Sequence, residues 1–167
     1  ASGVLELRLC RVEQFNALDS TMLELLHAAL DARLGECSSV LLTAAPGRAF
    51  CAGADVKHLS GLPSAAERLA FLHSEYSLHQ RLYAAAVPVV ALCDGIVMGA
   101  GAGLFMAASR RVASARTQFA MPEVKIGLCP DAGALHFLRV VAPPSVGQWL
   151  ALTGAKLNAA DTLGAGL

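Results

Sequence analysis

The sequence predicts one α/β domain, and two observations carry that prediction. Strand-like and helix-like hydrophobic patterns alternate along the chain, as they do when helices cover a mostly parallel sheet. The composition, with 55% hydrophobic and 16% charged residues among 167, is that of a chain that buries a sizeable core. We therefore assign residues 1–167 to a single domain.

The first strand and the first helix follow from the two hydrophobic periods. The segment VLELRL, residues 4–9, predicts a strand, and apolar residues then recur at helical spacing from Met22 to Leu30. Thr21 with Glu24 resembles a capping box, so we expect this helix to begin there.

The remaining elements repeat the alternation. SVLLTAA, residues 39–45, predicts a strand, a loop of small residues follows at 46–55, and a helix is expected over about 64–83. VPVVALCDG, residues 87–95, predicts a buried strand with a turn, and a glycine-rich turn feeds an apolar helix within 98–109. Two further helical stretches are expected near 132–141 and 144–153.

Charge, cysteine content and hydropathy argue against several kinds of partner. Thirteen basic and thirteen acidic residues balance, and no Lys/Arg cluster could neutralise a run of phosphates, which argues against nucleic acid. The five cysteines are an odd number without C-x-x-C spacing, so neither a disulfide framework nor a zinc ribbon is indicated. The most apolar stretch, residues 84–108, is interrupted by Pro88, Asp94 and several glycines, so we expect no membrane span.

The glycine-rich turn does not match a dinucleotide-binding fingerprint. Counted from Gly99, the sixth position of G-x-G-x-x-G is Leu104, and counted from Gly101 it is Met106. The small residues could instead serve close packing of helix on strand, or bring backbone N–H groups at a helix N-terminus near a polar group. A second small-residue loop at 52–54 supports the latter, because two N–H groups from separate loops are what an oxyanion hole requires.

Two acids stand in an almost wholly apolar passage. FAMPEVKIGLCPDAG, residues 119–133, carries Glu123 and Asp131 with one lysine between them. An ionised carboxylate away from water costs several kcal/mol unless it is paired, so such acids are caps, ion-pair members or parts of a reactive site.

These motifs together resemble one family. AFCAGADVK (49–57), GIVMGAGAGL (95–104) and the acidic passage look like the enoyl-CoA hydratase/isomerase, or crotonase, superfamily. Within it, SEY (74–76), the glycine-rich turn, MPE and PDAG have the mutual spacing of 3-hydroxyisobutyryl-CoA hydrolases. The resemblance implies a spiral of ββα turns that binds an acyl-CoA thioester.

The resemblance also assigns roles to residues. It places the thioester carbonyl oxygen between the backbone N–H groups of Ala54 and Ala100, and it makes Glu75, Ala100, Glu123 and Asp131 contacts of the acyl group. Relatives mostly have glycine at position 100, where the alanine methyl group could narrow the acyl pocket. Family pattern further places Ala52, Val56 and Lys57 along the CoA path, although a loop lysine can equally be a solvated side chain.

The reaction implied is hydrolysis rather than hydration. Hydratases of this superfamily carry two glutamates, one of them at the position of Gly103, and hydration calls for a base and an acid on opposite sides of a double bond. Dienoyl-CoA isomerases also have an acid at the position of Asp131, eight residues after the position of Glu123. However, they too carry an acid at the position of Gly103, which this chain lacks. Glu123 is left facing a polarised carbonyl, as nucleophile or as base for a water.

Alternatives remain for the two other acids. Asp131 could be a helix N-cap, a ligand of the acyl hydroxyl, or both. Glu75 and His79 stand at i and i+4 on the expected helix and could be a solvated pair. No motif indicates a metal site, and we expect no cofactor beyond the CoA of the substrate.

The family pattern raises questions beyond the site. Some relatives act as binding or assembly partners, so a protein that binds CoA without catalysis is the rival from another class. The resemblance implies a homo-oligomer in the mitochondrial matrix, with the cytoplasm as the alternative.

The pattern continues in relatives beyond LNAADTLGAGL, so we expect residues 1–167 to be an incomplete catalytic unit with exposed apolar surface at Phe137, Leu138, Val141, Trp149 and Leu152.

Overall fold

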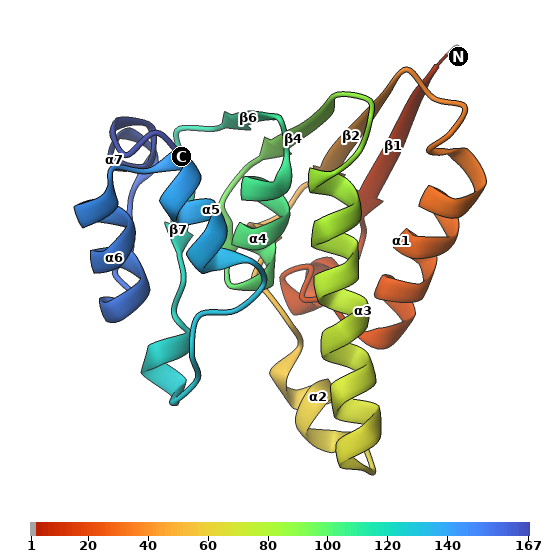
Figure 1. Ribbon diagram of the computed structural model, residues 1–167, viewed down its shortest axis with the longest axis horizontal. Helices are drawn as coiled ribbons and strands as arrows, with labels where there is room; N and C mark the ends of the chain where they lie inside the picture. Colours follow the sequence, from red (N-terminus) through yellow and green to blue (C-terminus); the bar gives the residue numbers. More distant parts are fainter. Residues whose placement is uncertain (1–2) are drawn as a thin grey trace.

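The computed structural model describes residues 3–167, which form two parallel sheets with a row of helices beside them (Figure 1). The four-stranded sheet has the order β1-β2-β4-β6. Its strands are β1 (Val4–Leu9), β2 (Ser39–Ala44), β4 (Val89–Cys93) and β6 (Arg110–Ala113). The three-stranded sheet has the order β3-β5-β7. Its strands are β3 (Ala49–Cys51), β5 (Ile96–Met98) and β7 (Gln118–Ala120).

The order of the strands along the chain makes the fold a spiral of ββα turns. Each of the pairs β2-β3, β4-β5 and β6-β7 contributes one strand to each sheet and is followed by helix. The helices are α1 (Ser20–Arg33), α2 (Val56–Gly61), α3 (Ala65–Tyr83), α4 (Ala100–Ala107), α5 (Ala134–Val141), α6 (Pro144–Thr153) and α7 (Ala159–Gly164). The predicted α/β class and the ββα spiral are therefore confirmed.

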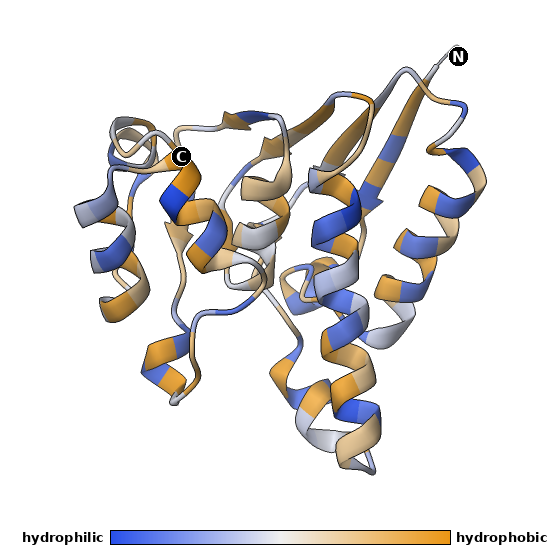
Figure 2. Ribbon diagram, viewed as in Figure 1, coloured by the Kyte–Doolittle hydropathy of each residue, from blue (hydrophilic) through white to orange (hydrophobic). Residues whose placement is uncertain are grey.

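Helix α4 is central, because it is buried along its whole length. All eight of its residues are buried, and it packs against α3 on one side and α5 on the other. Figure 2 shows no hydrophilic residue on it, whereas α3 alternates between hydrophilic and hydrophobic residues. A Cβ on Gly101 would lie 2.2 Å from the Cys51 carbonyl oxygen, so this glycine allows the helix to approach β3 closely. Close packing of helix on strand, one of the two roles that the sequence left open for the glycine-rich turn, is therefore confirmed for Gly101.

The helix starts only partly follow the expectation. The capping box predicted from Thr21 and Glu24 is wrong: Asp19 caps α1, and its side chain accepts a hydrogen bond from the Met22 N–H at 2.8 Å. Helix α3 begins where predicted, with Ser64 and Glu67 forming a full capping box.

The apolar side chains expected to be exposed divide into two groups. Trp149 and Leu152 on α6 are 48% and 77% exposed. Phe137 and Leu138 are instead buried, because their side of α5 faces the core, and Val141 is half-buried. The expected exposure of Phe137 and Leu138 is therefore wrong. Among residues 3–167 no helix combines the length and apolar character needed to cross a membrane.

Candidate active site

Two backbone segments meet at the N-terminus of α4. Gly53 has φ +107°, and a Cβ on it would lie 3.0 Å from the Met98 carbonyl oxygen and 3.3 Å from the Ala100 nitrogen. The loop that follows β3 therefore packs directly on the turn that follows β5. The two small-residue loops noted in the sequence lie together, as their proposed joint role requires.

Each of these segments presents a backbone N–H group without a partner. Leu18 donates to the Gly53 carbonyl and accepts from the Asp55 N–H, both at 2.8 Å, so the intervening Ala54 N–H points to the opposite side. Ala100 is the first residue of α4, where N–H groups have no intrahelical acceptor. Within residues 3–167 neither N–H donates a hydrogen bond. Two free N–H groups from separate loops are what an oxyanion hole requires, and the assignment of these two groups to one stays a prediction.

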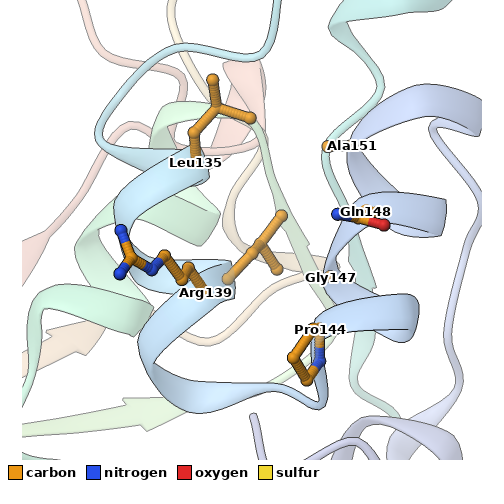
Figure 3. Close-up of a pocket in the computed structure, with 7 residues that line it drawn as sticks. Leu135, Arg139, Pro144, Gly147, Gln148 and Ala151 are labelled. Atoms are coloured by element: carbon orange, nitrogen blue, oxygen red, sulfur yellow. The ribbon is translucent and has the colours of Figure 1, made fainter.

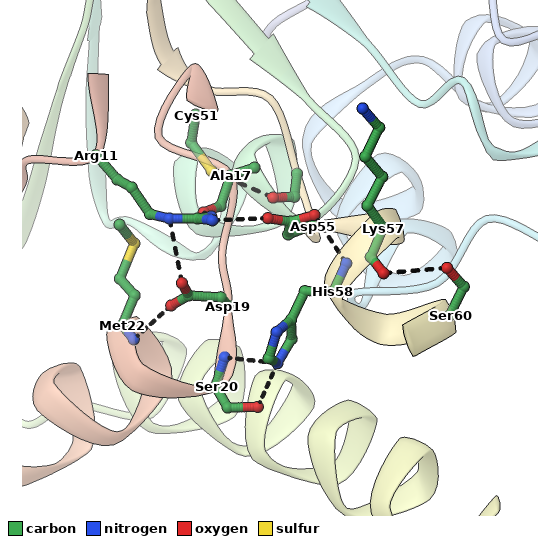
Figure 4. Close-up of polar contacts among 11 residues, drawn as sticks. Arg11, Ala17, Asp19, Ser20, Met22, Cys51, Asp55, Lys57, His58 and Ser60 are labelled. Atoms are coloured by element: carbon green, nitrogen blue, oxygen red, sulfur yellow. Dashed lines mark hydrogen bonds and ion pairs between the residues drawn. The ribbon is translucent and has the colours of Figure 1, made fainter. Parts of the chain in front are cut away.

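An arginine fixes the first of these loops (Figure 4). Arg11 lies 3.1 Å from a carboxylate oxygen of Asp19 and 2.8 Å from one of Asp55, and it donates to the Ala17 carbonyl at 2.8 Å. Asp55 caps α2 by accepting from the His58 N–H at 3.0 Å. That bond, with the Arg11 guanidinium, holds the pKa of Asp55 below its usual range. The loop bearing Ala54 is thus tied to the starts of both α1 and α2.

Glu123 faces the turn at the start of α4. It opens the 3₁₀ turn Glu123–Ile126 after β7 and is only 7% exposed. A Cβ on Gly99 would lie 3.0 Å from its Oε1, and its Oε2 has no hydrogen-bond partner in the described part of the chain. Burial raises the pKa of Glu123 to about 7; its own backbone N–H lowers the pKa and the Asp131 charge raises it further. A carboxyl of this kind changes its charge near neutral pH.

Glu75 joins Glu123 and Asp131 in one acidic cluster. It lies on α3 and is 1% exposed, and its Oε2 also lacks a partner among residues 3–167. Burial raises the pKa of Glu75 to about 8, and the charges of Asp131 and Glu123 add to the effect. The alternative of a solvated Glu75–His79 pair is wrong, because both side chains are buried. Glu75 is therefore protonated over most of the neutral range.

Asp131 is held by a tyrosine and caps no helix. The Tyr76 hydroxyl donates to its Oδ2 at 2.8 Å. The N-cap of α5 is Gly133, without a side-chain hydrogen bond, so the predicted capping role of Asp131 is wrong. The Asp131 backbone carbonyl instead accepts from the Ala134 N–H at 2.7 Å. Tyr76 stood in the SEY motif, but nothing in its spacing indicated this contact.

Position 103 has no room for a side chain. A Cβ there would lie 2.8 Å from the Ala132 carbonyl oxygen and 2.8 Å from His79 Nε2. Ala132 adopts the left-handed conformation, φ +48°, and this brings the PDAG loop onto α4. The space in which a second carboxylate would stand is therefore filled.

The residues assigned to the CoA path lie at the edge of the site. Ala52 is half-buried just after β3, whereas Val56 and Lys57 are exposed in the first turn of α2. The Lys57 side chain extends away from the Arg11 cluster in Figure 4. This position suits a surface contact with a long ligand, and their assignment stays a prediction.

A cavity of about 210 Å³ lies elsewhere, between α5 and α6 (Figure 3). Leu138, Pro144, Gly147 and Ala151 form its apolar walls, and Arg139 lies at its edge. None of the acids or free N–H groups lines it, so this cavity is separate from the acidic site. Within residues 3–167 no group of three or more His, Cys, Asp or Glu side chains is arranged to hold a metal ion.

Comparison with known proteins agrees with this fold. The family model described as enoyl-CoA hydratase/isomerase matches residues 4–167. The chain is 40% identical to "3-hydroxyisobutyryl-CoA hydrolase, mitochondrial" of Xenopus tropicalis, over 99% of this chain and 43% of that protein. It is 37% identical to "Small ribosomal subunit protein mS47" of Neurospora crassa, over 94% of this chain and 32% of that protein.

A solved structure shows the same fold. The crystal structure of an enoyl-CoA hydratase from Rhodobacter sphaeroides superposes with a TM-score of 0.87 at 38% identity, covering 96% of this chain and 49% of that one. The chain thus spans less than half the length of these relatives. Together with the family match over nearly every residue, the ββα spiral and the paired N–H groups, these similarities show that the chain belongs to the enoyl-CoA hydratase/isomerase family.

Proposed function

We propose that this protein hydrolyses a short acyl-CoA thioester resembling 3-hydroxyisobutyryl-CoA, releasing the free acid and CoA. One observation carries the proposal: the buried Glu123 carboxyl lies against the Gly99–Ala100 turn with one oxygen unpartnered, while Gly103 leaves no second carboxylate on α4. The similarity to the Xenopus hydrolase supports the choice of substrate.

The carbonyl oxygen is the group that the backbone recognises. The N–H groups of Ala54 and Ala100 would donate to the thioester oxygen, and these bonds strengthen as negative charge develops on it. Losing one such donor typically costs a factor of about 10² to 10³ in rate. The same polarisation makes the carbonyl carbon electrophilic toward a group standing beside Gly99, and Glu123 stands there.

Two routes lead from that complex to the products. In the first, a Glu123 oxygen bonds to the thioester carbon, the C–S bond breaks to release CoA as thiolate, and water then hydrolyses the mixed anhydride. In the second, Glu123 accepts a proton from a water whose oxygen bonds to the same carbon, the C–S bond breaks, and the departing thiolate takes up the proton to leave as the CoA thiol. Both routes need Glu123 ionised when the attack begins.

The other two acids suit a hydroxylated acyl group. Asp131 would accept a hydrogen bond from the 3-hydroxyl, with Tyr76 holding the carboxylate in place. Protonated Glu75 could donate to the substrate, because its raised pKa keeps a proton on it at neutral pH. Ala52, Val56 and Lys57 would contact the CoA portion at the site's edge.

The first test is Glu123→Gln. We expect this variant to keep its fold and its CoA affinity and to release thiol from 3-hydroxyisobutyryl-CoA at least ~10²-fold more slowly. Glu24→Gln, an exposed acid on α1, is the matched control and should retain full activity. Near-normal thiol release by the Glu123 variant would remove this residue from the mechanism.

Hydration is the second candidate, favoured by the similarity to the Rhodobacter hydratase structure. We expect crotonyl-CoA to be hydrated poorly or not at all, because Ala132 and His79 fill the space beside Gly103 where the second carboxylate would stand. The absorbance of the conjugated enoyl group reports the reaction directly. Its efficient loss would favour a hydratase over a hydrolase.

A protein that binds without catalysis is the rival from another class, and the similarity to a protein named as a ribosomal subunit motivates it. Complete absence of thiol release across short branched and hydroxylated acyl-CoAs, with CoA still bound, would favour that alternative. The retained acids Glu123 and Asp131 support catalysis instead.

The proposed substrate also suggests a location. The Xenopus relative is named as mitochondrial, and on that basis we propose a mitochondrial location for this protein. That it lies in the matrix, acts in valine catabolism and forms a homo-oligomer is implied by the family resemblance and belongs to the same proposal. Fractionation of organelles with an antibody against the protein checks the location.

A further inference from the structure

A buried histidine contacts the helix that carries the proposed carbonyl site. His79 lies on α3, one turn after Glu75, and is 2% exposed. Its Nε2 is 2.9 Å from the backbone carbonyl oxygen of Ala100. None of the roles proposed above uses this side chain as a hydrogen-bond donor.

The chemistry of the ring fixes the direction of this hydrogen bond. A carbonyl oxygen can only accept, so Nε2 must carry the proton and donate it. Burial lowers the pKa of His79 to about 4, although the backbone of Ala100, the Asp131 charge and the backbone of Glu75 oppose the effect. The ring is thus neutral at physiological pH, and its single N–H is committed to Ala100.

The space for the ring exists because residue 103 is glycine. A Cβ at that position would lie 2.8 Å from Nε2, closer than real side-chain contacts allow. The position that would otherwise present a side chain toward the site instead leaves room for the imidazole from the neighbouring helix. Gly103 and His79 are therefore complementary.

We propose that His79 is a positioning residue, which holds the first turn of α4 so that the Ala100 N–H stays aimed at the substrate carbonyl. This inference rests on the proposed function in one respect, namely that Ala100 binds a thioester oxygen. The C=O and the N–H of Ala100 belong to adjacent peptide planes that meet at its Cα. The helical dihedral angles of the first turn fix one plane relative to the other, so holding the carbonyl restrains the orientation of the N–H. The same bond ties α3, which carries Glu75 and Tyr76, to α4 at a fixed distance.

The test compares two substitutions of His79. Leucine removes the donor while filling much of the space, whereas the amide of glutamine reaches far enough to replace Nε2 as donor. We expect His79→Leu to lower kcat by about tenfold or more with KM changed less than about threefold, and His79→Gln to recover most of the loss. His73→Leu, an exposed histidine on the same helix, is the control.

An infrared measurement reads the carbonyl directly and needs no turnover. In a Glu123→Gln background, bound isobutyryl-CoA labelled with ¹³C at the carbonyl should show its C=O stretch at lower frequency than free in solution. Adding His79→Leu should remove much of that shift, and adding His79→Gln should restore it. If the His79→Leu substitution leaves the frequency shift of the carbonyl stretch unchanged, His79 is not a positioning residue.

The outcomes separate this inference from the proposed function. A carbonyl shift that depends on His79 in a protein without thiol release would support positioning while refuting hydrolysis. Thiol release that does not depend on His79 would support hydrolysis while refuting positioning. The absence of a carbonyl frequency shift in every variant would refute both the carbonyl site and this inference.

Should the leucine variant fail to fold, ¹⁵N NMR of the unaltered protein decides whether the hydrogen bond exists. The Nε2–H neutral form with a coupling to the Ala100 carbonyl carbon is expected. The neutral Nδ1–H form, or the absence of that coupling, would contradict the proposal.

Discussion

At the scale of single residues, the site works through three carboxyl groups in a poorly hydrated place. Burial raises the pKa of Glu123 to about 7 and that of Glu75 to about 8. The Glu123 charge contributes to the raised pKa of Glu75, so once Glu123 has ionised Glu75 holds its proton more tightly, and the two groups differ in protonation. Such a difference suits one acid that reacts as a carboxylate and one that donates a hydrogen bond.

The protonation states of Glu123 and Glu75 predict the pH dependence of hydrolysis. Because the carboxylate form of Glu123 is the reactive one, kcat/KM should rise as pH increases through about 7, and it should fall again near pH 8, where Glu75 loses the proton that it donates to the substrate. The Asp131 charge contributes to the raised pKa, so Asp131→Asn should move the midpoint to lower pH. Initial rates of thiol release between pH 5.5 and 8.5 measure both. A rate that is already highest at pH 5.5 and only falls as the pH increases would show that the protonated form of Glu123 is the reactive one.

The sequence could identify some of these residues but not others. Glu123 and Asp131 were visible because acids in an apolar passage are expensive and because their motif spacing is distinctive. The contacts of Tyr76 and His79 gave no signal, since each side chain acts through a residue more than twenty positions away that only the folded chain brings near. A histidine among apolar helix positions is compatible with many environments.

At the scale of elements, short loops are held by the caps of the helices they precede. Arg11 joins Asp19, the cap of α1, to Asp55, the cap of α2, and so restrains the loop that carries the Ala54 N–H. Asp19 and Asp55 are largely shielded from solvent, and their side chains are 19% and 14% exposed. Removing the arginine would leave two half-buried carboxylates without their counter-charge.

We therefore expect Arg11→Ala to lower the free energy of unfolding by about 1–3 kcal/mol and also to lower kcat. Arg116→Ala is the matched control, because its ion pair with Asp94 lies on the surface and surface pairs contribute little. Urea unfolding followed by circular dichroism measures both variants. Equal stability losses would show that the Arg11 cluster is no more than a surface network.

Element boundaries were predicted well where a helix is long and poorly where a cap or a short strand decides. Helix α3 was placed correctly because nineteen residues keep one pattern. The strands β3, β5 and β7 are three residues long, too short for any period to show, so the second sheet followed only from the family resemblance. The start of α1 was misplaced because Asp19 and Thr21 are both good capping residues, and contact with Arg11 favours Asp19.

At the scale of the whole molecule, apolar side chains remain on the surface of the last three helices. Leu135 and Val140 on α5 are 59% and 58% exposed, and Leu152 on α6 and Leu163 on α7 are 77% and 78% exposed. Trp149 on α6, 48% exposed, adds a large aromatic surface. Surfaces of this kind generally make contacts with other protein surfaces.

We expect the protein to associate as its concentration rises, and Leu152→Glu to shift it toward a monomer, because a charge on α6 would have to be desolvated in any contact made there. Light scattering coupled to size-exclusion chromatography gives the molar mass at each concentration. Leu25→Glu is the matched control, since Leu25 is a 66% exposed leucine on α1, away from this surface. If Leu25→Glu dissociates the protein and Leu152→Glu does not, the contact lies on α1. If the unaltered protein is a monomer at every concentration, the exposed side chains of the last three helices stay in water.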